Sequence, residues 1–178
     1  MIKKIFILFF GNIKLFFIKL FHFNNFKYNF YNNVSLNSEI ELKKYGKVCF
    51  GKKFILRRNC RISSYNGNII FGNNCGINNN CYIVSHESIL IGNNVEIGPN
   101  CVIVDHDHDY KREFELNGSK RFFKTSGIEI GDNVWIGANV IILRGTKIGN
   151  NCGIGAGSIV KGNYEDNSII IQKRMDVK

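Results

Sequence analysis

The chain has 178 residues, 18 glycines, one proline and a formal net charge of +10, and this length suffices for one domain with its own core. Residues 1–58 carry 12 Lys and Arg against 2 acids, whereas residues 59–178 carry 12 of each. The excess positive charge therefore belongs to the N-terminal part. Because aromatic and basic residues do not interleave in the neutral remainder, no nucleic-acid partner is expected.

The N-terminal segment, residues 1–23, has helical periodicity. On a helix of about 100° per residue, its polar residues share one half-turn and the opposite half is wholly Ile, Leu and Phe. No small-residue cleavage site follows the short apolar run IFILFF, which disfavours a secretory signal. Three interpretations stay open: a basic amphipathic helix in a membrane interface, a helix packed against the rest of the protein, or a membrane span, which Lys14 and Lys19 would interrupt.

From Phe50 onward the sequence repeats every six residues. Written from Ile130 it reads IGDNVW, IGANVI, ILRGTK, IGNNCG, IGAGSI, and the first position is apolar in all fifteen hexads between Phe50 and Val160. Five of the six cysteines occupy the fifth position of a hexad: Cys60, Cys75, Cys81, Cys101 and Cys152. Because no CxxC pair is present and free cysteine packs as a small hydrophobe, we interpret them as core-filling residues.

A slower period of three hexads overlies the first. Glycine often follows the apolar residue in two hexads of each three but never in the third, where pairs such as Ile83-Val84 occur. Glycine and asparagine at positions two to four suit tight corners, because these residues tolerate positive φ best. The pattern predicts an all-β fold, a triangular parallel β-solenoid of about five coils stacked roughly 4.8 Å apart.

Extra residues interrupt the repeat only on the third, glycine-free side. The longest insertion covers about residues 105–128 and opens with the segment VDHDHDYKREF, residues 104–114. Tyr65, His86 and His106 take equivalent positions on consecutive coils beside these insertions. Polar side chains gathered at one edge beneath a long loop indicate a functional site.

The hexads resemble those of the left-handed β-helix acyltransferases, the hexapeptide-repeat family, and most closely its galactoside, maltose and exopolysaccharide-type sugar O-acetyltransferases. The resemblance covers about residues 48–170 and is most specific in residues 128–160, which contain GDNVWIGA and IGAGSIV. It implies a left-handed parallel β-helix and a homotrimer that binds acetyl-CoA between subunits. The segments expected are residues 1–47 (helix and lead-in), residues 48–170 (β-helix with loop 105–128) and the tail, residues 171–178.

The resemblance also implies roles for single residues. The family's histidine base, in its His-Asp-Tyr form, matches His108, and His106 is the second candidate. The backbone N–H that receives the oxyanion in the family matches Ala138. Residues matched to CoA contacts, together with a lysine proposed for the CoA phosphates, are Trp135, Gly137, Ala138, Gly155, Ala156, Gly157 and Lys161. Residues near the family's acceptor contacts are Ser85, His86, Asp105 and His106.

The thioester is already activated, so the protein needs only to activate the alcohol, which is a poor nucleophile at neutral pH. A neutral imidazole takes the hydroxyl proton as the alcohol attacks. Its other nitrogen must be held by an acceptor, such as a backbone carbonyl or one of Asp105, Asp107 and Asp109. The expected reaction is acetyl transfer from acetyl-CoA to a sugar hydroxyl in surface-polysaccharide biosynthesis, on a free or lipid-linked saccharide. Acetyl-CoA is cytosolic, so the domain should face the cytoplasm, with residues 1–23 as the candidate for peripheral membrane contact.

Other interpretations stay open. The same scaffold can N-acetylate an amino sugar, or the solenoid can be a catalytically silent structural protein. His86 and His106 can be solvated corner residues, and Trp135 can be a packing residue. A metal site made by His86, His106 and His108 is disfavoured, because zinc needs three or four convergent ligands and the spacing does not match that of related zinc enzymes, so no metal is expected.

Overall fold

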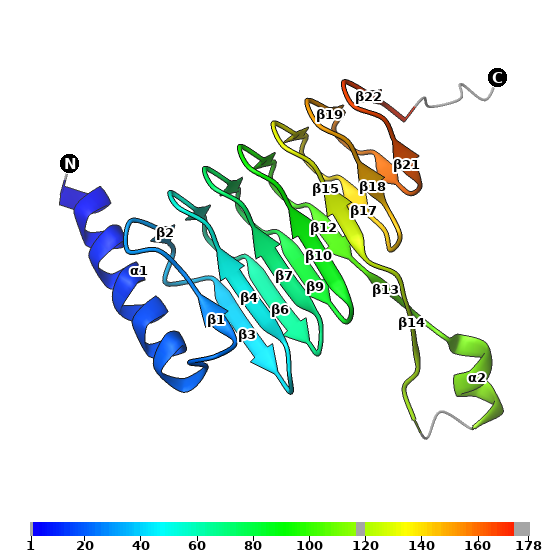
Figure 1. The fold of residues 1–178 in the computed structure, drawn as a ribbon, viewed down its shortest axis with the longest axis horizontal. Coiled ribbons are helices and arrows are strands. Elements are labelled where there is room, and N and C mark those ends of the chain that lie inside the picture. The colour runs from blue at the N-terminus through cyan, green and yellow to red at the C-terminus, as the bar shows by residue number, and fades with distance from the viewer. Residues whose placement is uncertain (1, 117–119, 173–178) are drawn as a thin grey trace.

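The structure is a computed structural model that describes residues 2–116 and 120–172, with side chains from residue 8 onward. Three parallel sheets wind into a triangular solenoid, helix α1 (Ile2–Phe21) lies across its N-terminal end, and a hairpin arm projects from its side (Figure 1). The C-terminal tail expected at residues 171–178 lies almost wholly outside the described residues.

The three sheets account for nearly all strands. The first sheet contains β1 (Phe26–Lys27), β4 (Lys47–Phe50), β7 (Asn68–Phe71), β10 (Ser88–Ile91), β15 (Ile128–Ile130), β18 (Lys147–Ile148) and β21 (Asn163–Tyr164). The second contains β2 (Asn33–Val34), β5 (Ile55–Leu56), β8 (Gly76–Ile77), β11 (Glu96–Ile97), β16 (Trp135–Ile136), β19 (Gly153–Ile154) and β22 (Ile169–Ile170). The third contains β3 (Glu39–Lys43), β6 (Arg61–Tyr65), β9 (Tyr82–Ser85), β12 (Val102–Val104), β17 (Ile141–Ile142) and β20 (Ile159–Val160).

We name the corners by the sheets they join. The first edge joins the first and second sheets, the second edge joins the second and third, and the third edge joins the third sheet to the first sheet of the next coil. The arm leaves from the third edge between β12 and β15. It consists of β13 (His106–His108), the short helix α2 (Tyr110–Glu115) and β14 (Phe123–Thr125), and β13 pairs antiparallel with β14.

The prediction of a parallel solenoid is confirmed, but the predicted number of about five coils is too low. Seven, seven and six strands in the three sheets make six full coils and two sides of a seventh. The missed coil lies in residues 26–43, part of the segment expected to be only a helix and lead-in. Its apolar positions, Tyr28, Val34 and Ile40, keep the spacing of six. Asn32 and Ser38 stand where later coils have apolar or cysteine residues, which hid the repeat.

The register explains the core. Each apolar first position pairs with its counterpart one coil away, as Ile77 pairs with Ile97 and Ile97 with Ile136. These side chains point inward and are almost fully buried. The five fifth-position cysteines are buried free thiols in the same core, as predicted. Core burial of this kind contributes about 25 cal/mol for each Å² of apolar surface removed from water, so the repeat itself stabilises the fold.

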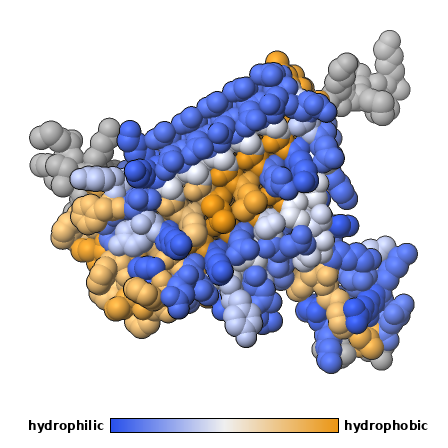
Figure 2. All heavy atoms as spheres, viewed as in Figure 1, coloured by the Kyte–Doolittle hydropathy of each residue, from blue (hydrophilic) through white to orange (hydrophobic). Residues whose placement is uncertain are grey.

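Asparagine and glycine make the corners in two different ways. The fourth hexad position has positive φ, with asparagine at most corners, for example Asn94 (56°) and Asn139 (58°). The asparagine side chains also bond to each other between coils, as Asn94 Nδ2 donates to Asn133 Oδ1 at 2.9 Å, and a hydrophilic band runs along the solenoid (Figure 2). The second-position glycines serve close approach instead: a Cβ on Gly72 would lie 2.5 Å from the Gly92 carbonyl oxygen.

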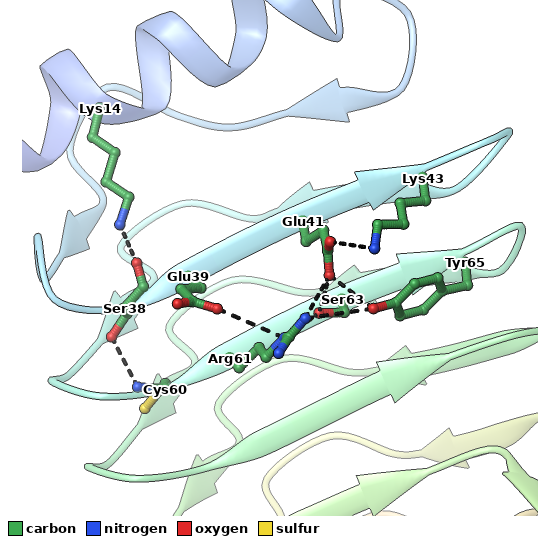
Figure 3. Close-up of polar contacts among 9 residues, drawn as sticks. All are labelled: Lys14, Ser38, Glu39, Glu41, Lys43, Cys60, Arg61, Ser63 and Tyr65. Carbon is green, nitrogen blue, oxygen red and sulfur yellow. Dashed lines mark hydrogen bonds and ion pairs between the residues drawn. The ribbon is translucent and has the colours of Figure 1, made fainter.

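Helix α1 closes the N-terminal end of the core with its polar side inward. Leu15 is fully buried, and a Cβ on Gly11 would lie 2.4 Å from the Val34 carbonyl oxygen. The Lys14 ammonium donates to the carbonyl oxygen of Ser38 (Figure 3). It also donates to the carbonyl oxygen of Leu36 at 3.1 Å. Burial lowers the pKa of Lys14, and the nearby Glu39 partly opposes this. The helix thus packs against the solenoid, and within the described residues no helix is long and apolar enough to cross a bilayer.

Candidate functional site at the third edge

A column of aromatic and imidazole rings runs along the third edge. Tyr65, His86 and His106 follow one another on consecutive coils because β6, β9 and β12 pair in register. The Tyr65 and His86 ring centroids are 5.3 Å apart with an interplanar angle of 21°, and those of His86 and His106 are 4.1 Å apart. Phe123 from the arm closes over the column, with its ring centroid 4.3 Å from that of His86 and 4.8 Å from that of His108.

These contacts define the surroundings of His86. It is packed among rings rather than solvated at a corner. Burial lowers the pKa of His86, the neighbouring His106 lowers it further, and Asp105 partly opposes both. His86 is therefore neutral at pH 7, where it can donate one hydrogen bond and accept another.

Asp105 lies beneath this column and is fully buried. Its carboxylate accepts from the Ser85 hydroxyl at 2.6 Å and from the backbone N–H groups of His86 at 2.8 Å and Glu87 at 2.9 Å. Burial raises the pKa of Asp105, but these hydrogen bonds and one with His106 more than offset it, and the pKa lies below its usual value. Since Ser85 is also fully buried, these two side chains hold the turn and do not face solvent.

His108 is held by a different carboxylate, that of Glu113. Its Nδ1 lies 2.9 Å from Glu113 Oε1, and the same carboxylate accepts from Phe122 N at 2.9 Å and from Arg121 Nη1 at 3.1 Å. The hydrogen bond with His108 is the main cause that lowers the pKa of Glu113 to about 2. An ionised carboxylate only accepts, so Nδ1 of His108 carries a proton, and in the neutral imidazole the lone pair lies on Nε2.

His108 is also the more accessible of the two candidate bases. Its side chain is 55% exposed, whereas that of His106 is 16% exposed. Within residues 2–116 and 120–172 nothing bonds to Nε2 of His108. The Nδ1 of His106 lies 3.4 Å from Asp105 Oδ1, a long contact for a hydrogen bond. The arrangement can therefore accept a proton at an open imidazole nitrogen whose orientation is fixed by a carboxylate.

Ion pairs fix the arm that carries His108. Asp109 pairs with Lys124 across the hairpin at 3.1 Å, and Asp107 pairs with Arg144 of the following coil at 2.5 Å. Arg112 lies over the Phe122 ring, 4.0 Å from its centroid. These contacts tie the arm to itself and to the solenoid, so the two neighbouring aspartates hold the arm rather than His108.

Tyr65, at the N-terminal end of the column, is fixed by charged neighbours. Its hydroxyl lies 2.8 Å from Glu41 Oε2, and the same oxygen lies 2.8 Å from Arg61 Nη2 (Figure 3). The hydrogen bonds from Lys43 and Arg61 lower the pKa of Glu41 to about 2. The column thus continues into a charged network on the third sheet.

The residues matched to CoA contacts lie elsewhere. Trp135 is on the outer side of the second sheet and is 58% exposed, so it is not a packing residue within this chain. Ala138 and Ala156 occupy the second edge on consecutive coils, where the Gly157 N–H donates to the Ala138 carbonyl at 2.8 Å. A Cβ added at Gly153 or Gly157 would meet nothing within 4 Å, so the surface beside Trp135 is open.

One chain therefore does not bring the predicted residues together. The acceptor and base residues, along with Lys161, lie at the third edge, whereas Trp135, Gly137, Ala138 and residues 155–157 lie on the second sheet and the second edge. Two residues that the sequence did not suggest, Glu113 and Phe123, complete the histidine cluster. Glu113 lies five residues after His108 in a loop rich in charged residues, and nothing in the sequence distinguishes it from the other acids there.

No group of three or more His, Cys, Asp or Glu side chains is arranged to hold a metal ion in the described part of the chain.

Comparisons with known proteins agree with this architecture. The family described as bacterial transferase hexapeptide (six repeats) matches residues 127–162. The chain is 32% identical over 132 residues to the putative lipopolysaccharide biosynthesis O-acetyl transferase WbbJ of Escherichia coli K12, covering 70% of this chain and 67% of that protein. It is 42% identical over 97 residues to the galactoside O-acetyltransferase of the same strain, but these span only 46% of that enzyme and 54% of this chain.

A solved structure gives the same picture. The hexapeptide-repeat acetyltransferase of Vibrio cholerae O1 biovar eltor, crystallised with acetyl coenzyme A, superposes with a TM-score of 0.55 and 26% identity. The match covers 75% of this chain and 66% of that one. The hexapeptide match also implies the left hand of the β-helix, which the positive-φ corners permit.

Proposed function

Because the chain belongs to the hexapeptide-repeat acyltransferase family, we propose that it transfers an acetyl group from acetyl-CoA to a sugar hydroxyl, with His108 as general base. The observation that carries the proposal is the His108–Glu113 pair at 2.9 Å, which orients the imidazole and leaves its Nε2 open on the arm. General-base catalysis of this kind contributes about 10²- to 10⁴-fold in rate.

The proposed reaction uses one imidazole for both proton transfers. Nε2 of His108 takes the proton of the hydroxyl while its oxygen forms a bond to the thioester carbonyl carbon. By the family resemblance, the backbone N–H of Ala138 receives the oxyanion. The C–S bond then breaks, and the imidazolium returns its proton to the departing CoA thiolate. Glu113 stays ionised throughout and stabilises the imidazolium that forms between the two transfers.

We propose that the site is completed by a second copy of the chain in a homotrimer. His108 and Ala138 lie at different edges of one solenoid, so one protomer would supply the imidazole and its neighbour the Trp135 and Ala138 side of the cleft. Gly155, Ala156, Gly157 and Gly137 would line the pantetheine arm there. Lys161 lies at the third edge, so it would reach the CoA phosphates only from the other protomer.

For the acceptor, we propose direct contacts from His86 and His106, while the buried Ser85 and Asp105 position them. The relative named for lipopolysaccharide biosynthesis supports a surface-polysaccharide sugar as the substrate class. Acetyl-CoA is a cytosolic metabolite, and we therefore place the catalytic edge on the cytoplasmic side.

A second candidate for the base is His106. Its ring lies 4.1 Å from that of His86, and its Nδ1 faces the buried carboxylate of Asp105. This assignment differs from the first only in which imidazole meets the hydroxyl, so single substitutions separate the two.

The test is acetyl transfer by the full-length protein, measured as CoA thiol release with hydroxyl and with amino sugar acceptors. We expect turnover with a hydroxyl acceptor and a kcat about 10²- to 10⁴-fold lower in His108→Ala. His22→Ala, at the end of the N-terminal helix, is the matched histidine control. A larger loss in His106→Ala than in His108→Ala would move the base to His106. Turnover only with amino acceptors would mean N-acetylation, and no acetyl-CoA binding would mean a silent solenoid.

A further inference from the structure

From Phe9 to Phe21, where the structure describes its side chains, the outer side of α1 is apolar and exposed. The helix presents its polar side to the solenoid, and the side chains exposed opposite are Phe9, Ile13, Phe16, Phe17, Leu20 and Phe21. Figure 2 shows hydrophobic residues gathered over this end of the molecule. A contiguous apolar surface of this kind marks an interaction site on a soluble domain.

The corner residues change in kind with distance from this helix. In the coil that contacts α1, corner positions three and four hold exposed apolar residues, Phe30 and Tyr31 at the first edge and Leu36 at the second. One coil further, position three is cationic at both edges (Lys52 and Arg58), and Lys53 and Arg57 stand beside it. In the next coil both positions are asparagine, as Asn73-Asn74 and Asn79-Asn80, and the fourth position stays asparagine at most later corners.

The basic ring is unpaired. Lys52, Lys53, Arg57 and Arg58 are exposed, and none forms an ion pair with any residue that the structure describes. The two acids of this end do not neutralise them, because Glu41 is engaged by Lys43 and Arg61, and Glu39 lies 3.7 Å from Arg61. Four exposed cations without an acidic partner among the described residues therefore lie one coil away from the coil that contacts α1.

We propose that this end docks on an anionic lipid bilayer, with the outer side of α1 in the interface and the solenoid axis pointing away from it. The order apolar, aromatic, cationic and neutral polar is the order of environments met on leaving a bilayer through its headgroups. Lys and Arg side chains near an anionic surface are attracted to it, and an amphipathic helix buries its apolar side at the acyl boundary. The partner proposed for this apolar helix face is a lipid surface. The alternative, that a second copy of the chain covers the face, is tested by the experiment below.

The experiment is flotation of the full-length protein with vesicles of phosphatidylcholine alone or with phosphatidylglycerol. We expect binding to the anionic vesicles that weakens with salt. Arg57→Glu/Arg58→Glu should lower the partition coefficient at least about ten-fold. Lys111→Glu/Lys120→Glu, the same charge change on the distant arm, should leave it within about two-fold. Phe16→Ser/Phe17→Ser should abolish binding, and circular dichroism should show that these exposed substitutions leave the fold intact.

Three outcomes would overturn the proposal: no binding of the unaltered protein to anionic vesicles, equal loss in the Lys111/Lys120 control, or dissociation of a larger oligomer by Phe16→Ser/Phe17→Ser with no vesicle binding. The last result would assign the surface to a second copy. Acetyl transfer to a soluble acceptor is measured on the same samples. Activity without vesicle binding would therefore overturn docking alone, and vesicle binding without activity would overturn only the proposed function.

Discussion

The two candidate bases sit beside carboxylates with different tasks. Asp105 is buried and receives two backbone N–H groups, so its first role is to hold the turn that carries His86. Glu113 receives one backbone N–H and orients the exposed imidazole of His108. Substitution of Asp105 should therefore lower the stability of the fold, whereas substitution of Glu113 should lower the turnover number.

Glu113→Gln should lower kcat about 10²-fold with little change in the KM for acetyl-CoA. A glutamine amide can present an N–H to Nδ1, which favours the tautomer with the lone pair on the wrong nitrogen. Steady-state kinetics on the purified protein measures this. Glu115→Gln, an exposed acid on the same helix α2, is the control and should match the unaltered protein. Unchanged turnover in Glu113→Gln, or no recovery in Glu113→Asp, would argue against a positioning role.

Asp105→Ala should destabilise the fold by about 3 kcal/mol, because it leaves the buried Ser85 hydroxyl and two part-buried backbone N–H groups without their acceptor. Asp107→Ala is the control, since its exposed pair with Arg144 should contribute less than about 1 kcal/mol. Urea unfolding at fixed protein concentration compares them. The Asp105 contribution is present above the unfolded pKa of about 3.9 and is lost as pH falls through the lower folded pKa. Equal destabilisation by the two substitutions would contradict this account.

At the scale of the element, the corner is the unit that the sequence specifies best. Asparagine and glycine at positions two to four predict the corners, and the structure shows two separate requirements behind that pattern. The fourth position needs positive φ, as at Asn94, while the second needs the absence of a Cβ, as at Gly72. The sequence pattern alone could not separate these, because glycine satisfies both.

Gly72→Ala and Gly153→Ala should change the free energy of unfolding by amounts that differ in sign or size. The Cβ added at position 72 would lie 2.5 Å from the Gly92 carbonyl oxygen, and such overpacking costs about 1–3 kcal/mol. The Cβ added at position 153 meets nothing within 4 Å, and there the loss of unfolded-state freedom stabilises by up to about 1 kcal/mol. Thermal unfolding followed by circular dichroism compares the two. A similar drop in Tm for both would show that coil spacing does not depend on these glycines.

At the scale of the molecule, periodicity predicts the fold and most of the core, because every apolar first position has an equivalent partner one coil away. The earliest coil escaped prediction because Asn32 and Ser38 replace its apolar fifth-position residues. The sequence also located the histidine edge, because insertions fall only there. The His108–Glu113 pair could not be predicted, since it depends on how the arm folds back on itself through β13 and β14.

Because the rise between coils is constant, the number of coils determines the distance between two sites on the solenoid. Three steps separate Lys43, on the coil beside α1, from His106, so the reactive edge stands about 14 Å along the axis from that coil. With α1 docked on a bilayer as proposed, this distance suits a lipid-linked saccharide whose sugar extends away from the membrane surface. Insertion or deletion of one coil between α1 and the histidine edge would move the imidazole by about 4.8 Å. The number of coils would therefore determine how far from the membrane an acceptor sugar must extend to be acetylated.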